Sequence, residues 1–411
     1  MAFRFPDGFV WGAATAAHQV EGNNVNSDFW VLEHAPESLF PERSGDACDH
    51  YHRYPDDIRL LRELGFSAYR FSIEWARIEP EEGCFSAAAL EHYRRMLARC
   101  HEHGLRPCVT FHHFTSPRWF TADGGWEVPE NADRFARYCA RSARHLGDLV
   151  DTAYTINEAN LPASLAVSGL LPEEGLKNRA PFVAAAAARC GTDLARFGPF
   201  LLGHPMRIRD TMLAAHARAR EALKAGPHEF PVGLTLAMPD YQALPGGEAQ
   251  CDRARAESFD PFLELARADD FVGVQTYSRQ RFGPDGPVGP EPGVPVLALG
   301  YELWPEALEG TIRYAHAATA GPIAVTENGI GTDDDAQRIE YVGRALAAVT
   351  RCLADGIDLR GYFYWSLLDN FEWLYGYGPR FGLVEVDRAT QRRRVKQSGE
   401  WLGAIARANA L

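Results

Sequence analysis

The chain has 411 residues and a formal net charge of −13, because 42 Lys and Arg face 55 Asp and Glu. Its composition, 46% hydrophobic and 24% charged, is typical of a soluble globular protein with a large core. The acidic balance argues against broad binding to nucleic acids or anionic membranes, which requires a cationic surface.

Eight short apolar runs, rich in β-branched and aromatic residues, are predicted strands of a parallel sheet buried on both faces. Helix-like stretches separate them and stop at glycines, which relieve the strain of a left-handed terminal residue. This alternation predicts a single (β/α)₈ barrel, an α/β fold, forming one catalytic domain over residues 1–411. The predicted strands are 9–17, 68–75, 106–113, 152–158, 231–238, 271–277, 323–328 and 359–367, and the clearest helices are 56–64, 87–103, 131–146 and 335–355, followed by Gly65, Gly104, Gly147 and Gly356.

Two segments are predicted surface excursions: residues 159–205, and residues 282–295, which are dense in Gly and Pro. Excursions after the carboxyl end of a strand cover the active-site mouth in such barrels. The acidic run from Asp333 to Asp335 could bind a cation, but a helix N-cap is the favoured interpretation.

The start of the chain shows no signal peptide, and no apolar stretch approaches the roughly 20 residues that cross a bilayer. A cytoplasmic location is therefore expected. Eight scattered cysteines without a Cys-x-x-Cys pair are predicted to be reduced and mostly buried. The sequence leaves the oligomeric state open.

Two glutamates, Glu158 and Glu327, fall at the ends of the fourth and seventh predicted strands, where barrel enzymes place functional residues. Two carboxyl groups facing one another can cleave a glycosidic bond, one as acid and the other as nucleophile or as base for water. Arg70 could keep Glu327 ionised, whereas Glu158 would need a raised pKa. Their separation, which decides between retention and inversion, is not readable from sequence.

Further polar and aromatic residues surround these strand ends. Taken singly, each has a structural explanation: a histidine or glutamine can be structural, a tryptophan can be packing, and Glu74 can pair with Arg70 or Arg77. Their joint placement favours a sugar site, in which flat rings meet C–H faces and polar groups meet hydroxyls. The candidates are Gln19, His113, Asn157, Tyr277, Asn328, Trp365, Glu372, Trp373 and Phe381.

Six sequence blocks together resemble the family 1 glycoside hydrolases, the β-glucosidases and their relatives. The resemblance runs from Phe9 to Asp387. Two blocks would carry the acid/base and nucleophile motifs, and one the sugar-binding motif near the end of the chain. In order they are 9–22 (FVWGAATAAHQVEG), 69–80 (YRFSIEWARIEP), 109–117 (VTFHHFTSP), 155–158 (TINE), 325–329 (VTENG) and 365–373 (WSLLDNFEW).

The resemblance implies a retaining exo-β-glycosidase that forms a covalent glycosyl–enzyme intermediate and uses no metal and no cofactor. Glu158 would be the general acid/base and Glu327 the nucleophile, with Arg70 and Tyr277 beside it. A small-molecule glycoside would be the substrate. Its terminal sugar would be held by Gln19, His113, Asn157, Glu372 and Trp373, on the platform of Trp365, with Phe381 near C6.

Three departures from the family pattern are Ala159, where proline usually follows the acid/base, and Gln275 and Thr276, where Asn and Tyr usually stand. They border the leaving-group side and leave the aglycone open. A 6-phospho-β-glycosidase is disfavoured because Glu372 would repel a phosphate. A thioglucosidase would lack Glu158, and a non-catalytic sugar-binding homologue would typically lack one glutamate. A transglycosylase stays open.

Overall fold

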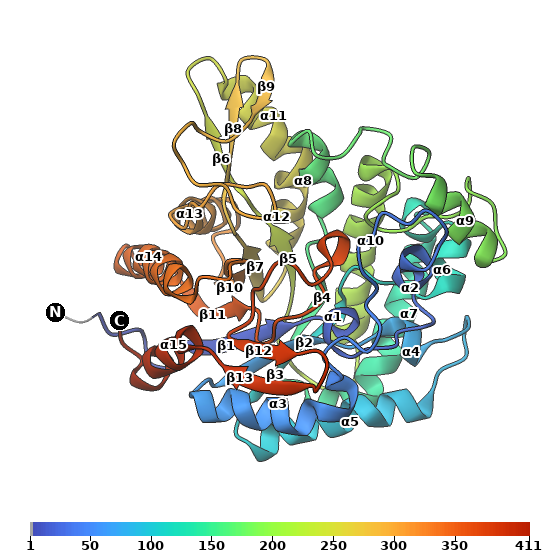
Figure 1. Cartoon of the computed structure of the whole chain (residues 1–411), viewed down its shortest axis with the longest axis horizontal. Coiled ribbons are helices and arrows are strands. Elements are labelled where there is room, and N and C mark those ends of the chain that lie inside the picture. The colour runs from blue at the N-terminus through green and yellow to red at the C-terminus, as the bar shows by residue number, and fades with distance from the viewer. Residues whose placement is uncertain (1–2) are drawn as a thin grey trace.

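The computed structural model describes residues 3–411. Eight parallel strands close into a barrel in the order β1-β11-β10-β7-β5-β4-β3-β2, with helices around the outside (Figure 1). The predicted (β/α)₈ fold is thereby confirmed, and all eight predicted strands occur. The barrel strands are β1 (Val10–Thr15), β2 (Ala68–Ser72), β3 (Arg106–His112), β4 (Thr152–Ile156), β5 (Val232–Ala237), β7 (Phe271–Gln275), β10 (Ile323–Asn328) and β11 (Leu359–Trp365).

Apolar side chains from six barrel strands pack together as a small cluster that is separate from the main core. Because these side chains come from strands around the whole ring, the cluster fills the barrel interior. At Gly12 a Cβ atom would lie 2.3 Å from the Phe363 ring, so this packing requires glycine there. The guanidinium of Arg70 lies 5.0 Å from the Tyr154 ring centroid, on the cluster.

The outer helices bury their apolar faces against the barrel. Helix α3 begins at His50 rather than at the predicted Asp56, with Pro55 inside it. Gly65, Gly104 and Gly356 are left-handed, with φ of 105°, 67° and 85°. Gly147 is not: it begins the 3₁₀ turn Gly147–Leu149, so its predicted left-handed cap is wrong. The outer helices are α3 (His50–Leu64), α5 (Ala87–Glu102), α7 (Asn131–Leu146), α10 (Pro205–Lys224), α11 (Glu248–Ser258), α12 (Asp260–Ala266), α13 (Ala307–Thr319), α14 (Asp335–Ala354) and α15 (Gln397–Ala408).

The connections add short helices and two small sheets outside the barrel (Figure 1). The excursion 159–205 contains α8 and α9, whereas 282–295 contributes to the sheet β6-β8-β9. Asp334 caps α14 by accepting from the backbone N–H groups of Ala336 and Gln337, which confirms the N-cap interpretation. These elements are α1 (Ala17–Val20), α2 (Asp28–Glu33), α4 (Trp75–Ile78), α6 (Arg118–Ala122), α8 (Leu161–Val167), α9 (Pro181–Arg189), β6 (Asp240–Ala243), β8 (Arg279–Gly283), β9 (Gly286–Val288), β12 (Val384–Asp387) and β13 (Arg392–Val395), with 3₁₀ turns at Gly125–Glu127 and Trp373–Tyr375.

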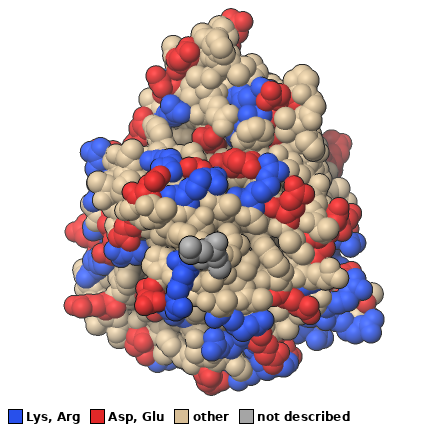
Figure 2. Space-filling model, turned by 90° about the vertical axis from the view of Figure 1, so that its left-hand side faces the viewer, with Lys and Arg blue, Asp and Glu red and all other residues tan. Residues whose placement is uncertain are grey.

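Acidic and basic side chains lie next to one another on the molecular surface, as one face shows in Figure 2. Within residues 3–411, no helix has the length and apolar character needed to cross a membrane. Six of the eight cysteines are buried, and all eight carry free thiols, as predicted.

Candidate active site

Both predicted catalytic glutamates line one cavity of about 360 Å³ beyond the carboxyl ends of the barrel strands. Glu327 lies within β10 and Glu158 lies two residues beyond β4, with β5 and β7 between these strands in the ring. Six predicted sugar-site residues line the same cavity. Three further predicted residues form hydrogen bonds beside it: Gln19 with Glu372, Asn157 with His113, and Arg70 with Glu327. The six lining residues are His113, Tyr277, Trp365, Glu372, Trp373 and Phe381.

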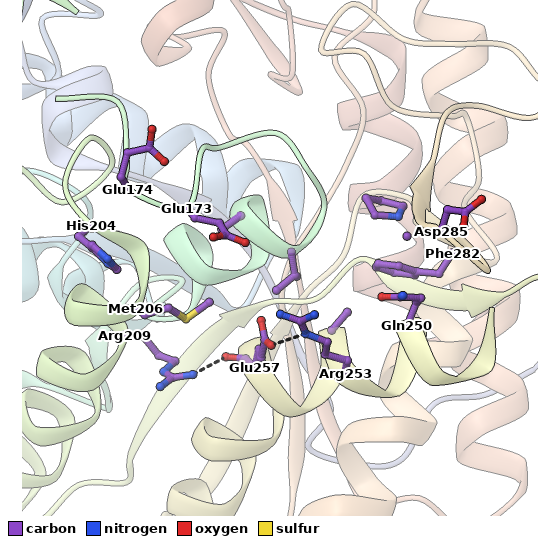
Figure 3. A pocket seen from close by; sticks show the side chains of 15 residues that line it. Glu173, Glu174, His204, Met206, Arg209, Gln250, Arg253, Glu257, Phe282 and Asp285 are labelled. Carbon is purple, nitrogen blue, oxygen red and sulfur yellow. Dashed lines mark hydrogen bonds and ion pairs between the residues drawn. The ribbon is translucent and has the colours of Figure 1, made fainter. Parts of the chain in front are cut away.

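A larger cavity of about 810 Å³ contains none of the predicted site residues. It lies between α8, α10, α11 and the β8–β9 hairpin, and Figure 3 shows its charged lining. Arg253 pairs with the Glu257 carboxylate at 2.7 Å, and Arg209 donates to the Glu257 carbonyl at 3.2 Å. Residues of the excursion 282–295 line this cavity and reach the catalytic one through Glu291 and Val288, which bond Arg279 and Gln280 on its wall, whereas residues of the excursion 159–205 line the catalytic cavity directly.

Glu327 has a hydrogen-bond donor on each carboxylate oxygen. Arg70 Nη1 donates to Oε1 at 2.7 Å, and the Tyr277 hydroxyl donates to Oε2 at 2.7 Å. Burial raises the pKa of Glu327, and the Arg70 cation and these hydrogen bonds oppose that rise. The carboxylate is thus held in one orientation by groups that favour its ionised form.

Glu158 lies in the opposite environment. Burial raises the pKa of Glu158 well above its usual range, and the negative charge of Glu327 raises it further, against the smaller effect of Arg70. Its backbone is left-handed, with φ 46°, and its N–H donates to Thr235 Oγ1 at 3.2 Å. A non-glycine residue rarely adopts this conformation, so the surrounding structure holds Glu158 in place. Glu327 therefore ionises before Glu158 does.

Asn157 is the centre of a buried hydrogen-bond network. Its Oδ1 accepts from Arg70 Nη2 at 2.5 Å, from Gln275 Nε2 at 2.8 Å and from Thr235 Oγ1 at 3.3 Å. The longer side chain of Gln275 thus extends to Asn157 and bonds it. In the barrel, Gln275 is also the register partner of Glu327 on the neighbouring strand. Thr235 was not predicted as a site residue. The available signal was that Thr235 is the only side chain with a hydroxyl in the otherwise apolar strand β5.

His113 is the hydrogen-bond partner of the Asn157 amide nitrogen. Asn157 Nδ2 lies 3.1 Å from His113 Nε2, and burial lowers the pKa of His113 well below its usual range. Because the amide nitrogen donates to Nε2, the neutral ring carries its proton on Nδ1. That Nδ1 is buried without a partner in the described structure, so it is available to a ligand.

Gln19 and Glu372 form a second polar group beside the cavity. Gln19 Nε2 donates to the Phe371 carbonyl at 2.7 Å and to Glu372 Oε2 at 3.4 Å, while Gln19 Oε1 is buried without a partner in the described structure. Burial and the charge of Glu327 raise the pKa of Glu372 to about 8. These groups offer hydrogen bonds that the protein itself leaves unused.

Flat aromatic rings border the same space. The Trp365 ring stacks on His113 with centroids 5.5 Å apart, and Phe381 meets Tyr277 edge to face at 5.9 Å. The Trp373 ring is supported by His18, at 5.7 Å and nearly parallel, and by Phe114 at 5.1 Å. His18 and Phe114 were not predicted, because nothing in the sequence shows that they support Trp373.

Glu74 pairs with neither Arg70 nor Arg77, so that prediction is wrong. Arg70 binds Glu327, and Arg77 binds Glu21 at 2.8 Å. Glu74 instead accepts from Thr115 Oγ1 at 2.8 Å and from the backbone N–H of Ala76 at 3.1 Å. Burial and the nearby Glu21 raise the pKa of Glu74 to about 8.

A Glu74→Gln variant is expected to lose part of the pH dependence of stability. The folded-state pKa of Glu74, about 8, exceeds its ordinary value of 4.5, so the stabilisation is complete below pH 4.5 and is lost as pH rises through 8. Urea unfolding at several pH values measures this effect. Between pH 4.5 and 8, the free energy of unfolding of the wild type should fall with pH more steeply than that of the variant, by about 1 kcal/mol per pH unit. The stabilities of the two proteins should be closest at pH 4.5 and below, and equal slopes would contradict this assignment.

The fold and its cavity define an enzyme of the barrel glycosidase class. The profile described as glycosyl hydrolase family 1 matches residues 1–282 and 287–411, and the chain belongs to this family, whose members hydrolyse O-glycosyl bonds. It is 33% identical to beta-glucosidase A of Thermotoga maritima over 99% of both chains, and 32% identical to a bifunctional beta-D-glucosidase/beta-D-fucosidase of Bifidobacterium breve over 98% of both. The solved structure of beta-glycosidase BGL167 is 53% identical with a TM-score of 0.94, covering 98% of this chain and 97% of that one.

Proposed function

We propose that this protein is a retaining exo-β-glycosidase of the β-glucosidase type, which releases terminal β-linked sugars from small glycosides. The observation that carries the proposal is the pair of buried glutamates in one cavity: Arg70 and Tyr277 donate to Glu327 and oppose the rise of its pKa, while burial and the charge of Glu327 raise the pKa of Glu158 well above its usual range. The names of the curated relatives favour glucose as the sugar.

In the first step, the Glu327 carboxylate attacks the anomeric carbon while Glu158 donates its proton to the leaving oxygen. A covalent glycosyl–enzyme forms and the aglycone leaves as an alcohol. In the second step, the Glu158 carboxylate takes a proton from water, whose oxygen attacks the anomeric carbon and displaces Glu327. Two inversions at that carbon give net retention.

The change in the role of Glu158 follows from the charge of its neighbour. While Glu327 is an anion, its charge helps to keep Glu158 protonated. Once Glu327 is esterified to the sugar, that charge is gone, the pKa of Glu158 falls, and the residue becomes a base for water. The proposed chemistry thus requires only two carboxyl groups.

The terminal sugar is bound, in this proposal, by hydrogen-bonding groups that the protein leaves unused. Gln19 Oε1 accepts from one hydroxyl and His113 Nδ1–H donates to another, while Asn157 Nδ2, which gives one of its two protons to His113, donates the other to the 2-hydroxyl. Trp365 and Trp373 contact the C–H faces, and Phe381 packs near C6. The buried Glu372 favours a neutral sugar over a 6-phosphosugar, because its carboxyl group, which accepts from Gln19, offers a phosphate no positive charge.

The test is proton NMR of the anomeric signal during hydrolysis of p-nitrophenyl β-D-glucoside. We expect the β-anomer of glucose to appear first and the α-anomer to grow later by mutarotation. An α-anomer that appears first would overturn the retaining mechanism. Absence of hydrolysis with β-glucosides, β-galactosides and β-fucosides would overturn the proposed function.

A further inference from the structure

We propose that the outer part of the active-site cavity binds an apolar aglycone, an alkyl or aryl group, in preference to a second sugar. The inference rests on the proposed function, because it takes Glu158 as the group that protonates the leaving oxygen. Residues that follow Glu158 on the cavity wall then stand on the leaving-group side. Helix α8 begins three residues after Glu158, and Leu161 and Leu165 both line the cavity.

Leucine dominates this outer wall. Seven leucines line the cavity, and they come from three separate connections of the barrel. Leu161, Leu165 and Leu170 follow β4, Leu299 precedes α13, and Leu374 follows β11. Met238 and Pro239, just beyond β5, complete the same surface. Separate segments therefore converge on one apolar wall, which is the arrangement of a binding site for apolar ligands.

Solvent exposure points to the same place. Six large hydrophobic side chains are exposed among residues 3–411, and three of them line this cavity. Leu170 is 72% exposed, Tyr375 47% and Leu374 38%. Exposed apolar groups that gather at one opening mark a ligand site, because a ligand removes their surface from water.

The charged and amide groups beside these leucines already have protein partners. Arg279 pairs with Glu302 at 2.5 Å and with Glu291 at 2.6 Å, and its guanidinium lies 3.4 Å from the Trp304 ring centroid. Gln280 Nε2 donates to two backbone carbonyls, each at 3.0 Å. A second sugar would bury several hydroxyls here and would find few partners for them.

The inner part of the cavity, in contrast, contains buried polar atoms without hydrogen-bond partners in the described structure. They include Gln19 Oε1, His113 Nδ1, Gln275 Oε1 and the Tyr301 hydroxyl. Tyr301 belongs to this inner set because its ring lies 6.4 Å from that of Tyr277, which binds Glu327. Unused hydrogen-bonding groups therefore lie near the nucleophile, and the mouth offers apolar surface.

The test compares butyl, hexyl and octyl β-D-glucosides, below the concentration at which they form micelles, with cellobiose. The leaving alcohols of the three alkyl glucosides differ in length but hardly in acidity, so a difference in kcat/KM reports contact with the mouth. We expect kcat/KM to rise about twofold to fourfold per methylene. Octyl glucoside should exceed cellobiose by about tenfold or more.

Two matched variants locate the effect. The double variant Leu170→Ser, Leu374→Ser should reduce the octyl-to-butyl ratio of kcat/KM to below about threefold. Leu39→Ser changes a leucine that is 62% exposed and lies outside the cavity, so it should leave the ratio unchanged. An equal loss in both variants would overturn the proposal.

Calorimetry with butyl and octyl β-D-thioglucosides measures binding without relying on turnover. Tighter binding of the octyl compound supports the apolar mouth, even in a protein that hydrolyses no glycoside, in which case the proposed function alone fails. Hydrolysis with no dependence on chain length, or with cellobiose preferred, overturns the apolar mouth and leaves the proposed function standing.

Discussion

A Glu327→Ala variant is expected to lose hydrolysis of p-nitrophenyl β-D-glucoside by roughly 10⁶-fold, the order found when a hydrolase loses its nucleophile. The alanine cannot form the glycosyl–enzyme intermediate. Added azide or formate should fill the vacated space and attack the anomeric carbon once. The measurement is rescue of activity together with the product configuration, which should be inverted, an α-glycosyl azide.

The matched control for this variant is Glu327→Gln, which keeps the size of the side chain and the contact with Tyr277. It should be as inactive as the alanine variant but should not be rescued, because no space opens for the anion. If Glu327→Ala with azide gave the β-glycosyl azide, the nucleophile would be a different residue.

A Glu158→Ala variant is expected to discriminate between leaving groups. A general acid contributes about 10²- to 10⁴-fold when the departing oxygen needs a proton. We therefore expect kcat/KM to fall within that range for an alkyl β-glucoside and by less than about tenfold for the 2,4-dinitrophenyl glucoside, whose phenolate leaves unaided. The quantity to compare is kcat/KM, which reports the first chemical step.

Azide again provides an independent measurement on this variant. It should speed the second step, which normally needs Glu158 as a base, and give the β-glycosyl azide, because Glu327 still forms the intermediate. An equal loss of kcat/KM for both kinds of leaving group would show that Glu158 is not the acid.

Motifs within the chain were sufficient to predict the barrel and to name both glutamates. Each strand can be read locally, since a strand buried on both faces is a short apolar run that ends in a polar residue. The carboxyl ends of parallel strands meet at one end of the barrel, so Glu158 and Glu327 were expected to share a site. The structure places both in one cavity.

Predictions that depended on partners in space were less successful. Glu74 was expected to pair with an arginine, yet Thr115 and a backbone N–H bind it. Thr235 was overlooked, although it contacts both Asn157 and Glu158. The direction of an arginine side chain is a property of the folded interior, and many pairings are compatible with the same strand order.

The sequence by itself determined the order of the eight strands, the two carboxyl groups and the family pattern around them. Those features are local, because strand periodicity and motif spacing do not depend on the rest of the molecule. Arg70 and Tyr277 were expected beside Glu327, and the structure gives each of them a hydrogen bond to it. Only the tertiary structure decided that Glu158 has no cation paired with it among the described residues and that Thr115, rather than an arginine, binds Glu74. The difference between the two glutamates arises from burial and neighbouring charge, which exist only after the barrel has closed.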